Sequence, residues 1–168
     1  MSRLDSFIRR LEAQRTVLNW AASAIEGKDG IVLELGLGNG RTYDHLRELL
    51  PDRAIHVFER NPQPNPRSMP PERFLVVGDM AQTLPAFGER HGAAAVLVHV
   101  DVTTGAPERD IIAFSWLPAH TAALAMTGAI VVSGWPLEHD KLEAVPLPEG
   151  VPAEGVPDGR YVAYRRVA

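Results

Sequence analysis

The sequence contains no cysteine among its 168 residues. It can form no disulfide bond and offers no thiolate chemistry, a composition compatible with a reducing cytoplasm. It also lacks an excess of positive charge, since 17 basic and 21 acidic residues give a formal charge of −4. Proteins that bind nucleic acids usually present a basic surface, so this balance argues against a nucleic-acid partner. Charges interrupt the N-terminal segment every few residues, and we therefore expect neither a signal peptide nor a membrane-spanning helix.

The length of the chain indicates one domain. A chain of 168 residues is long enough for one well-packed core and leaves little for a second. It has no internal repeat and no linker long enough to divide it. We predict a single domain over 1–168, with an N-terminal helical cap over 1–28 and an α/β core over 29–168, in a cytoplasmic protein.

Alternating strand and helix patterns predict five β-α units followed by a hairpin. Strands are expected at Ile31–Leu35, Ala54–Glu59, Arg73–Gly78, Ala93–Asp101 and Ala129–Ser133. Helical spacing predicts one or two helices over Asp5–Ile25, then Thr42–Leu50, Met80–Phe87 and Glu108–Met126, the last with a kink or a new helix at Pro118. Two further strands, Leu142–Leu147 and Arg160–Val167, have no helix between them and can therefore only pair antiparallel.

The segment 61–71 has five prolines in eleven residues. Each proline lacks an N–H and restricts the residue before it, so the segment is not expected to form a helix. It is either a flexible connection or an extended wall beside a ligand. We favour the first interpretation for most of the segment.

The stretch around which the rest is organised is an apolar strand that ends in an acid and runs into three alternate glycines, Gly36, Gly38 and Gly40. Glycines allow positive φ and let a ligand approach the backbone, and the helix start beyond them presents free N–H groups. In an open parallel sheet, ligands bind at the carboxyl ends of the strands. Glu59 closes the second strand there, and a carboxylate at this place accepts hydrogen bonds from the two hydroxyls of a ribose.

A nicotinamide dinucleotide and S-adenosylmethionine both fit this pattern, and the glycine spacing separates them. The dinucleotide pattern requires a small residue where this chain has Arg41. The third glycine of this chain, Gly40, falls one position earlier than that pattern requires. An aminoacyl tail also requires an acid near its ammonium group, which Glu34 offers. The spacing therefore favours S-adenosylmethionine.

The run Glu34-Leu35-Gly36-Leu37-Gly38-Asn39-Gly40 resembles the first motif of class I S-adenosylmethionine-dependent methyltransferases. Glu59 resembles their second motif, Gly78-Asp79-Met80 the third and Val96–Asp101 the fourth. The resemblance covers almost the whole chain. It implies a Rossmann-like three-layer α/β/α sandwich, whose mostly parallel seven-stranded sheet has the order 3-2-1-4-5-7-6 and ends in an antiparallel C-terminal hairpin.

The resemblance also implies the residues that bind the cofactor. The loop from Gly36 through Leu37, Gly38 and Asn39 to Gly40 is expected to hold the methionine moiety, with Arg41 or Thr42 reaching its carboxylate. Glu59 is expected on the ribose, Asp79 on the adenine amino group and Met80 against the ring. Asp79 also has the pattern of a helix cap with Gln82. The remaining predicted contacts are Glu34, Arg60, Gly78, His99 and Asp101. S-adenosylhomocysteine is the product that this cofactor leaves.

Catalysis is less clearly marked. Asp101 and His99 at the end of the fourth strand, and His139 or Asp140 after the fifth, are candidate bases; His99 is equally consistent with a buried core residue. His120 has no identifiable partner, and Trp20, Trp116 and Trp135 are more often core than pocket residues. Asp101-Val102-Thr103-Thr104-Gly105 lacks the Asn/Asp-Pro-Pro-aromatic motif of enzymes that methylate amines of bases or glutamine amides. Nothing after the fifth strand supplies a paired acid, so no metal is expected.

Three hypotheses follow. The first is a methyltransferase that acts on a small-molecule acceptor, with no membrane or nucleic-acid partner. The second is a dinucleotide-dependent oxidoreductase, disfavoured by Arg41. The third is a non-catalytic protein that binds S-adenosylmethionine. A chain of this length often completes its pocket with a second copy, so a homo-oligomer is a further prediction.

Overall fold

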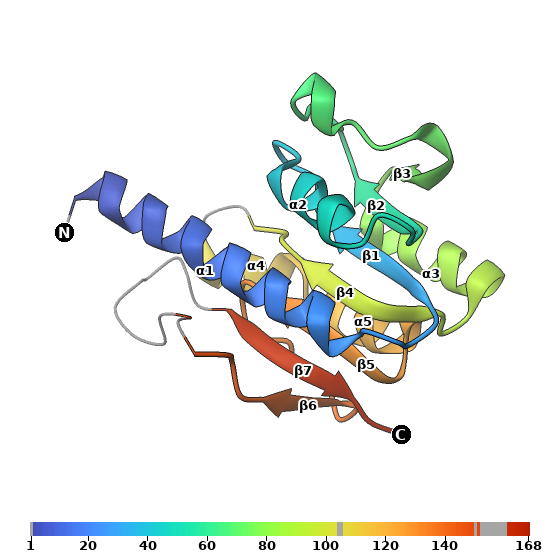
Figure 1. Cartoon of the computed structure of the whole chain (residues 1–168). Coiled ribbons are helices and arrows are strands. Elements are labelled where there is room, and N and C mark those ends of the chain that lie inside the picture. The colour runs from blue at the N-terminus through green and yellow to red at the C-terminus, as the bar shows by residue number, and fades with distance from the viewer. Residues whose placement is uncertain (1, 104–105, 150, 152–160) are drawn as a thin grey trace.

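The computed structural model describes residues 2–103, 106–149, 151 and 161–168. Seven strands form one sheet, in the order β3-β2-β1-β4-β5-β7-β6 (Figure 1). The strands are β1 (Ile31–Leu35), β2 (Ile55–Glu59), β3 (Leu75–Val77), β4 (Ala95–Val100), β5 (Ala125–Ser133), β6 (Leu142–Val145) and β7 (Val162–Arg166). The first five pair in parallel, whereas β7 pairs antiparallel with both β5 and β6. The predicted fold class and strand order are confirmed.

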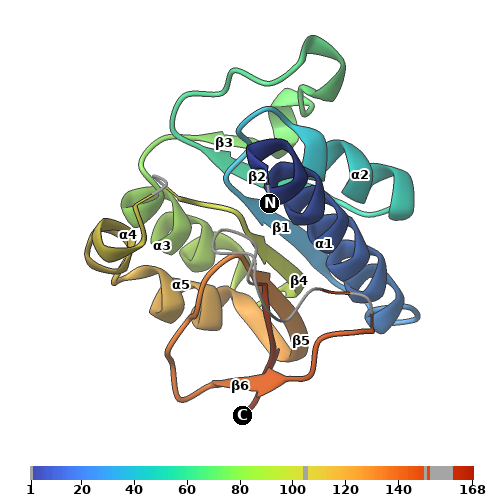
Figure 2. The same ribbon diagram turned by 90° about the vertical axis from the view of Figure 1, so that its left-hand side faces the viewer.

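Helices cover both faces of the sheet (Figures 1 and 2). They are α1 (Arg3–Ala24), α2 (Arg41–Leu49), α3 (Met80–His91), α4 (Pro107–Ala113) and α5 (Leu117–Leu124). Alternate residues of each central strand point to opposite faces. In β1, Val32 packs with the side chains of α1 and α2 in one core cluster, and Leu33 packs with those of α3 and α5 in the other. The sheet is thus the middle of three layers.

Helix α1 extends past the sheet. A capping box formed by Ser2 and Asp5 begins the helix, but its first fully buried residue is Ala13. The first turns project beyond the carboxyl ends of the parallel strands, as Figure 1 shows. Leu4 and Ile8 in these turns are 65% and 45% exposed. Within the described ranges, no helix is long and apolar enough to cross a membrane.

The proline-rich segment is more ordered than the sequence suggests. It contains no α-helix, as predicted, but Pro66–Ser68 form a single 3-10 turn, η1, and a second turn, η2 (Glu72–Phe74), leads into β3. The Asn65 side chain accepts a hydrogen bond from the Arg67 N–H at 3.0 Å and begins the first turn. Such short turns tolerate proline because their first N–H groups have no partner inside the helix.

Several predicted boundaries are wrong in the second half of the chain. Helix α3 ends at His91 instead of Phe87, and β6 ends at Val145 instead of Leu147. The helical segment expected over Glu108–Met126 is two helices, the second of which begins beside Pro118 as one of the two predicted alternatives. The last two residues of the segment belong to β5, which begins at Ala125 instead of Ala129. Gly128, with φ +82°, lies in an irregularity where β5 has more residues than β4 opposite it. An irregular strand of this kind does not show the alternation that sequence patterns detect. The predicted start of the last strand, Arg160, lies outside the described residues.

Candidate functional site

Hydrogen bonds join the ends of strands β1, β2 and β4 directly behind the glycine loop. The Gly36 N–H donates to the Phe58 carbonyl at 2.9 Å, and the Asp101 N–H donates to the Leu35 carbonyl at 2.9 Å. A Cβ on Gly36 would lie 2.6 Å from the Asp101 carbonyl oxygen. Only glycine therefore fits at this point, where the chain leaves β1 and passes against the end of β4.

Gly38 and Gly40 serve different purposes. Gly38 has φ +48°, and no described atom lies within 4 Å of the place that its Cβ would take. Gly40 has φ +85° and a Cβ there would lie 2.7 Å from that of Ser68 and 3.0 Å from that of Pro64. The Asn39 carbonyl also accepts a hydrogen bond from the Asn65 N–H at 3.0 Å. Gly40 thus allows the proline-rich segment to pack on the loop, while Gly38 leaves open space.

Glu59 holds the glycine loop in place. One carboxylate oxygen accepts hydrogen bonds from the N–H groups of Leu37 at 3.0 Å and Gly38 at 3.3 Å, and the other accepts from Asn61 at 3.1 Å. Burial raises the pKa of Glu59, but these N–H donors and that of Arg60 lower it further, so the pKa lies below its usual value. The carboxylate is therefore ionised at neutral pH and remains partly exposed at the carboxyl edge.

The turn after β3 carries Gly78, Asp79 and Met80. Asp79 caps α3 as predicted, because its carboxylate accepts from the Ala81 N–H at 3.0 Å. The other oxygen accepts from the Arg60 guanidinium at 2.8 Å. The cap N–H and Arg60 hold the pKa of Asp79 below its usual value. Asp79 is 42% exposed, and Met80 packs against the core cluster beneath α3. Both residues lie at the same edge of the sheet as Glu59.

Glu34 does not face this edge openly. It is fully buried, one oxygen accepts from the Thr42 hydroxyl, and the other is 2.6 Å from His99 Nδ1. Burial lowers the pKa of His99, but the charge of Glu34, their hydrogen bond and the charge of Asp101 raise it further, to above its usual value. The protonated form of His99 is therefore favoured beside Glu34, and the pair is enclosed under α1. His99 Nε2 finds no hydrogen-bond partner among the described residues.

Asp101 is exposed at the end of β4 and contacts α1. Its carboxylate accepts a hydrogen bond from the Gln14 side-chain amide at 3.0 Å. Gln14 was not among the predicted site residues, because a polar residue on an amphipathic helix is expected on the solvent face. Tyr161, just before β7, stacks on His99 with ring centroids 6.3 Å apart. Glu34, His99, Asp101 and Tyr161 thus form one polar layer beneath α1.

The other predicted candidates lie elsewhere. Leu142 begins β6 and pairs with Arg166 of β7. The residue before Arg166 in β7, Arg165, pairs with Ile130 of β5, and the two strands run antiparallel, so the start of β6 lies towards the start of β5. His139 lies three residues before Leu142 and is therefore near the edge where the parallel strands begin. Its ring accepts a hydrogen bond from the Lys141 N–H at 3.1 Å. This position is opposite to Asp101, and Asp140 shares it. His120 lies against the ring of Trp116 with centroids 5.7 Å apart.

Of the three tryptophans, Trp135 lies at the candidate edge. It follows β5, and its indole N–H donates to the Val102 carbonyl at 3.1 Å. Trp116 donates to the Ala113 carbonyl within its own loop at 3.0 Å. Trp20 packs against the core cluster beneath α1. No group of three or more histidine, aspartate or glutamate side chains in the described part of the chain is arranged to hold a metal ion.

Comparisons with known proteins agree with this geometry. The family described as S-adenosyl-L-methionine methyltransferase matches residues 1–166. The crystal structure of an S-adenosyl-L-methionine methyl transferase from Silicibacter pomeroyi DSS-3 is 42% identical, with a TM-score of 0.91 over 99% of both chains. No curated protein matches significantly.

More distant structures share the fold. The antibiotic-resistance methyltransferase Kmr has a TM-score of 0.55 at 11% identity, over 87% of this chain and 90% of its own. The 1,6-didemethyltoxoflavin-N1-methyltransferase of Burkholderia thailandensis has a TM-score of 0.51 at 14% identity, over 94% and 80%. At such identities the likeness shows only the architecture.

The sheet order and the family match define a class I S-adenosylmethionine-dependent methyltransferase. The chain belongs to the S-adenosyl-L-methionine methyltransferase family, and S-adenosylmethionine is its cofactor, with S-adenosylhomocysteine as the product. This assignment leaves the dinucleotide-dependent oxidoreductase and the non-catalytic binder without support. The residues present fit the cofactor, since Gly38 leaves open space beside an ionised carboxylate at the expected ribose position.

Proposed function

We propose that the enzyme transfers the methyl group of S-adenosylmethionine to a small-molecule acceptor, at the carboxyl edge of β1, β2 and β4. The observation that carries this proposal is the open space at Gly38, whose N–H donates to the Glu59 carboxylate, in the loop that begins at Gly36 against the Asp101 carbonyl at the end of β4. A small acceptor is favoured by the acidic charge of the chain, −4, which offers no general attraction to nucleic acid.

The loop Gly36–Gly40 would hold the methionine moiety of the cofactor. Glu59 would accept from the ribose hydroxyls in competition with its loop contacts, because the N–H groups of Leu37, Gly38 and Asn61 already occupy three of the about four acceptor positions of a carboxylate. Asp79 would accept from the adenine amino group, with Met80 beneath the ring. Thr42 is committed to Glu34, which leaves the exposed Arg41 as the candidate for the cofactor carboxylate.

The sulfonium of the cofactor supplies an activated methyl group, so the protein mainly has to align the acceptor with it. Asp101 is our candidate for the group that orients the acceptor or removes its proton, because it is exposed at the carboxyl edge. His99 is fully buried and bonded to Glu34, and it therefore acts as a positioning residue behind Asp101. His139 is on the far edge and takes no part.

The first test is calorimetric titration with S-adenosylmethionine, S-adenosylhomocysteine and NAD, followed by release of radiolabelled methyl groups to candidate acceptors. We expect micromolar binding of the first two and none of NAD. Glu59→Ala should weaken binding about 30- to 150-fold, because it removes charge-assisted hydrogen bonds worth about 2–3 kcal/mol. Glu48→Ala, an exposed acid on α2, is the matched control and should bind normally. Unchanged affinity in Glu59→Ala would contradict the assigned ribose contact.

A further inference from the structure

The glycine loop is held at both of its ends. At its start, the Gly36 N–H donates to the Phe58 carbonyl at 2.9 Å. At its other end the loop passes into α2, which begins at Gly40 without a side-chain cap. Thr42 in the first turn of α2 reaches back instead, and its hydroxyl donates to the Glu34 carboxyl group. One side chain of β1 thus holds the helix that follows the loop.

His99 fixes Glu34 from the other side. The second oxygen of Glu34 is 2.6 Å from His99 Nδ1, and the two residues lie opposite each other in the register of β1 and β4. The ring of Tyr161 stacks on that of His99 with centroids 6.3 Å apart. Glu34 and His99 are fully buried, and Thr42 is 6% exposed. Thr42, Glu34 and His99 therefore form one buried chain of contacts from α2 through β1 to β4, which we call the loop clamp.

Between its fixed ends, the middle of the loop is open. Gly38 and Asn39 are exposed, and no described atom lies within 4 Å of the place that a Cβ on Gly38 would take. The Gly38 N–H makes the longest of three contacts with the Glu59 carboxylate, 3.3 Å against 3.0 and 3.1 Å. A loop that is fixed at its ends presents its open middle in one geometry, which reduces the entropy lost when a ligand binds.

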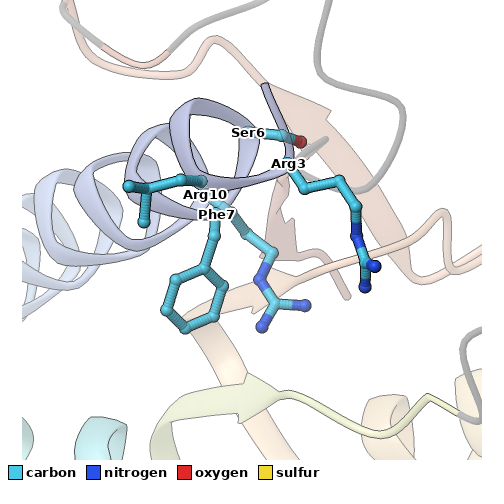
Figure 3. A pocket seen from close by; sticks show the side chains of 5 residues that line it. Arg3, Ser6, Phe7 and Arg10 are labelled. Carbon is cyan, nitrogen blue, oxygen red and sulfur yellow. The ribbon is translucent and has the colours of Figure 1, made fainter. Parts of the chain in front are cut away.

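A hollow beside the first turns of α1 shares no residue with the clamp. Its described lining residues all belong to that helix, and Figure 3 labels four of them, Arg3, Ser6, Phe7 and Arg10. None of them belongs to the glycine loop or to a strand end. The clamp contacts the helix that ends the loop directly, and it is therefore the better candidate for control of cofactor binding.

We propose that Thr42 and His99 are positioning residues, which act through Glu34 to fix the glycine loop for the methionine moiety of the cofactor. The sequence also made Glu34 and Thr42 candidates for direct contact with the aminoacyl tail. Both oxygens of Glu34 and the hydroxyl proton of Thr42 are already committed within the clamp, which favours the indirect role. The proposal rests on the proposed function, in which this loop holds the methionine moiety, and adds the residues that shape the loop.

The test compares two ligands by calorimetry on the full-length protein, S-adenosylhomocysteine and 5′-methylthioadenosine, which keeps the adenosine and the sulfur but has no aminoacyl tail. We expect the wild-type protein to bind S-adenosylhomocysteine about tenfold more tightly or better. Thr42→Val removes the hydroxyl with little change of shape. It should weaken S-adenosylhomocysteine by about tenfold or more and 5′-methylthioadenosine by less than about threefold. Thr42→Ser keeps the hydroxyl and should restore the wild-type preference.

A double variant separates the clamp from a direct contact of Thr42 with the cofactor. Glu34→Met with His99→Leu replaces the buried pair by apolar side chains, a change that often preserves folding. Neither position is exposed to a ligand, so the same selective loss of S-adenosylhomocysteine is expected only if the clamp acts through the loop. Leu124→Ala, in the core cluster on the other face of the sheet, is the destabilised control and should keep the wild-type preference. Circular dichroism checks that each variant is folded.

The proposal is overturned if Thr42→Val weakens both ligands equally or neither, if Thr42→Ser does not restore the preference, or if the folded double variant keeps it. Equal binding of the two ligands to the wild-type protein, or an equal loss of preference in Leu124→Ala, would also overturn it. Failure of the wild-type protein to bind S-adenosylhomocysteine at all would instead refute the proposed function.

Discussion

Glu34 lies in the fully buried interior, where an unpaired carboxylate would be strongly unfavourable. Thr42 and His99 occupy its two oxygens. The raised pKa of His99 means that folding favours its protonated form. A group with a raised pKa stabilises the fold fully below its unfolded pKa, about 6.5, and this contribution disappears as the pH rises through the folded pKa. The buried pair should therefore make folding stability depend on pH above 6.5.

Glu34→Gln tests this dependence. At pH 6 the variant should lose about 3–5 kcal/mol of unfolding free energy, because the imidazolium then lacks its counter-charge. The difference from the wild-type protein should narrow as the pH rises through the folded pKa of His99, because the imidazole is then neutral in both proteins. Urea denaturation at several pH values measures it, with His139→Gln as the control histidine in an exposed turn. A difference that does not vary with pH would mean that His99 is neutral in the folded protein.

The sequence alone indicated Glu34 and His99 separately but not as a pair. Their contact depends on the register between β1 and β4, in which Glu34 lies opposite His99. Register between strands more than sixty residues apart is set by the assembled sheet, and local patterns do not encode it. The same holds for Gln14 and Asp101, which meet only when α1 packs over β4. Asp79, by contrast, was predictable as a cap because the cap and its donor are two residues apart.

At the scale of elements, the loop between β1 and α2 and the proline-rich segment behave as one unit. Gly40 and Asn39 carry its contacts with Pro64, Asn65 and Ser68. The segment thus braces the glycine loop, and the interpretation of it as a passive connection is wrong for residues 64–68. Proline content correctly excluded an α-helix, but it carries no information about what an extended segment packs against.

Two alanine substitutions separate the glycine that folding requires from the glycine that the ligand requires. Gly40→Ala should lower the unfolding free energy by about 2–3 kcal/mol, since the new Cβ meets Ser68 and positive φ is strained. Gly38→Ala should cost only about 1 kcal/mol, but weaken S-adenosylhomocysteine binding at least tenfold by filling the open space. Thermal melting and calorimetry on both variants measure the two effects. Equal effects of the two substitutions on binding would contradict this division.

At the scale of the whole molecule, the candidate site is made by the ends of four strands. The glycine loop follows β1, Glu59 ends β2, Asp79 follows β3 and Asp101 follows β4. Sequence patterns located these ends well, because buried parallel strands are apolar and stop at polar residues. None of the four ends forms the site by itself, so the site exists only when the sheet is assembled.

Cofactor binding should therefore stabilise the entire fold at once. We expect a single unfolding transition, as for one domain over 1–168, with an added unfolding free energy of about 2.7 kcal/mol at S-adenosylhomocysteine concentrations of about 100 times Kd. Urea denaturation followed by tryptophan fluorescence and by circular dichroism measures this, and the two signals should coincide. Glu59→Ala at the same ligand concentration should lose most of the increment, because its Kd is higher, while Glu48→Ala keeps it. Two separate transitions, of which the ligand moves only one, would show that 1–28 or another part of the chain folds independently of the cofactor site.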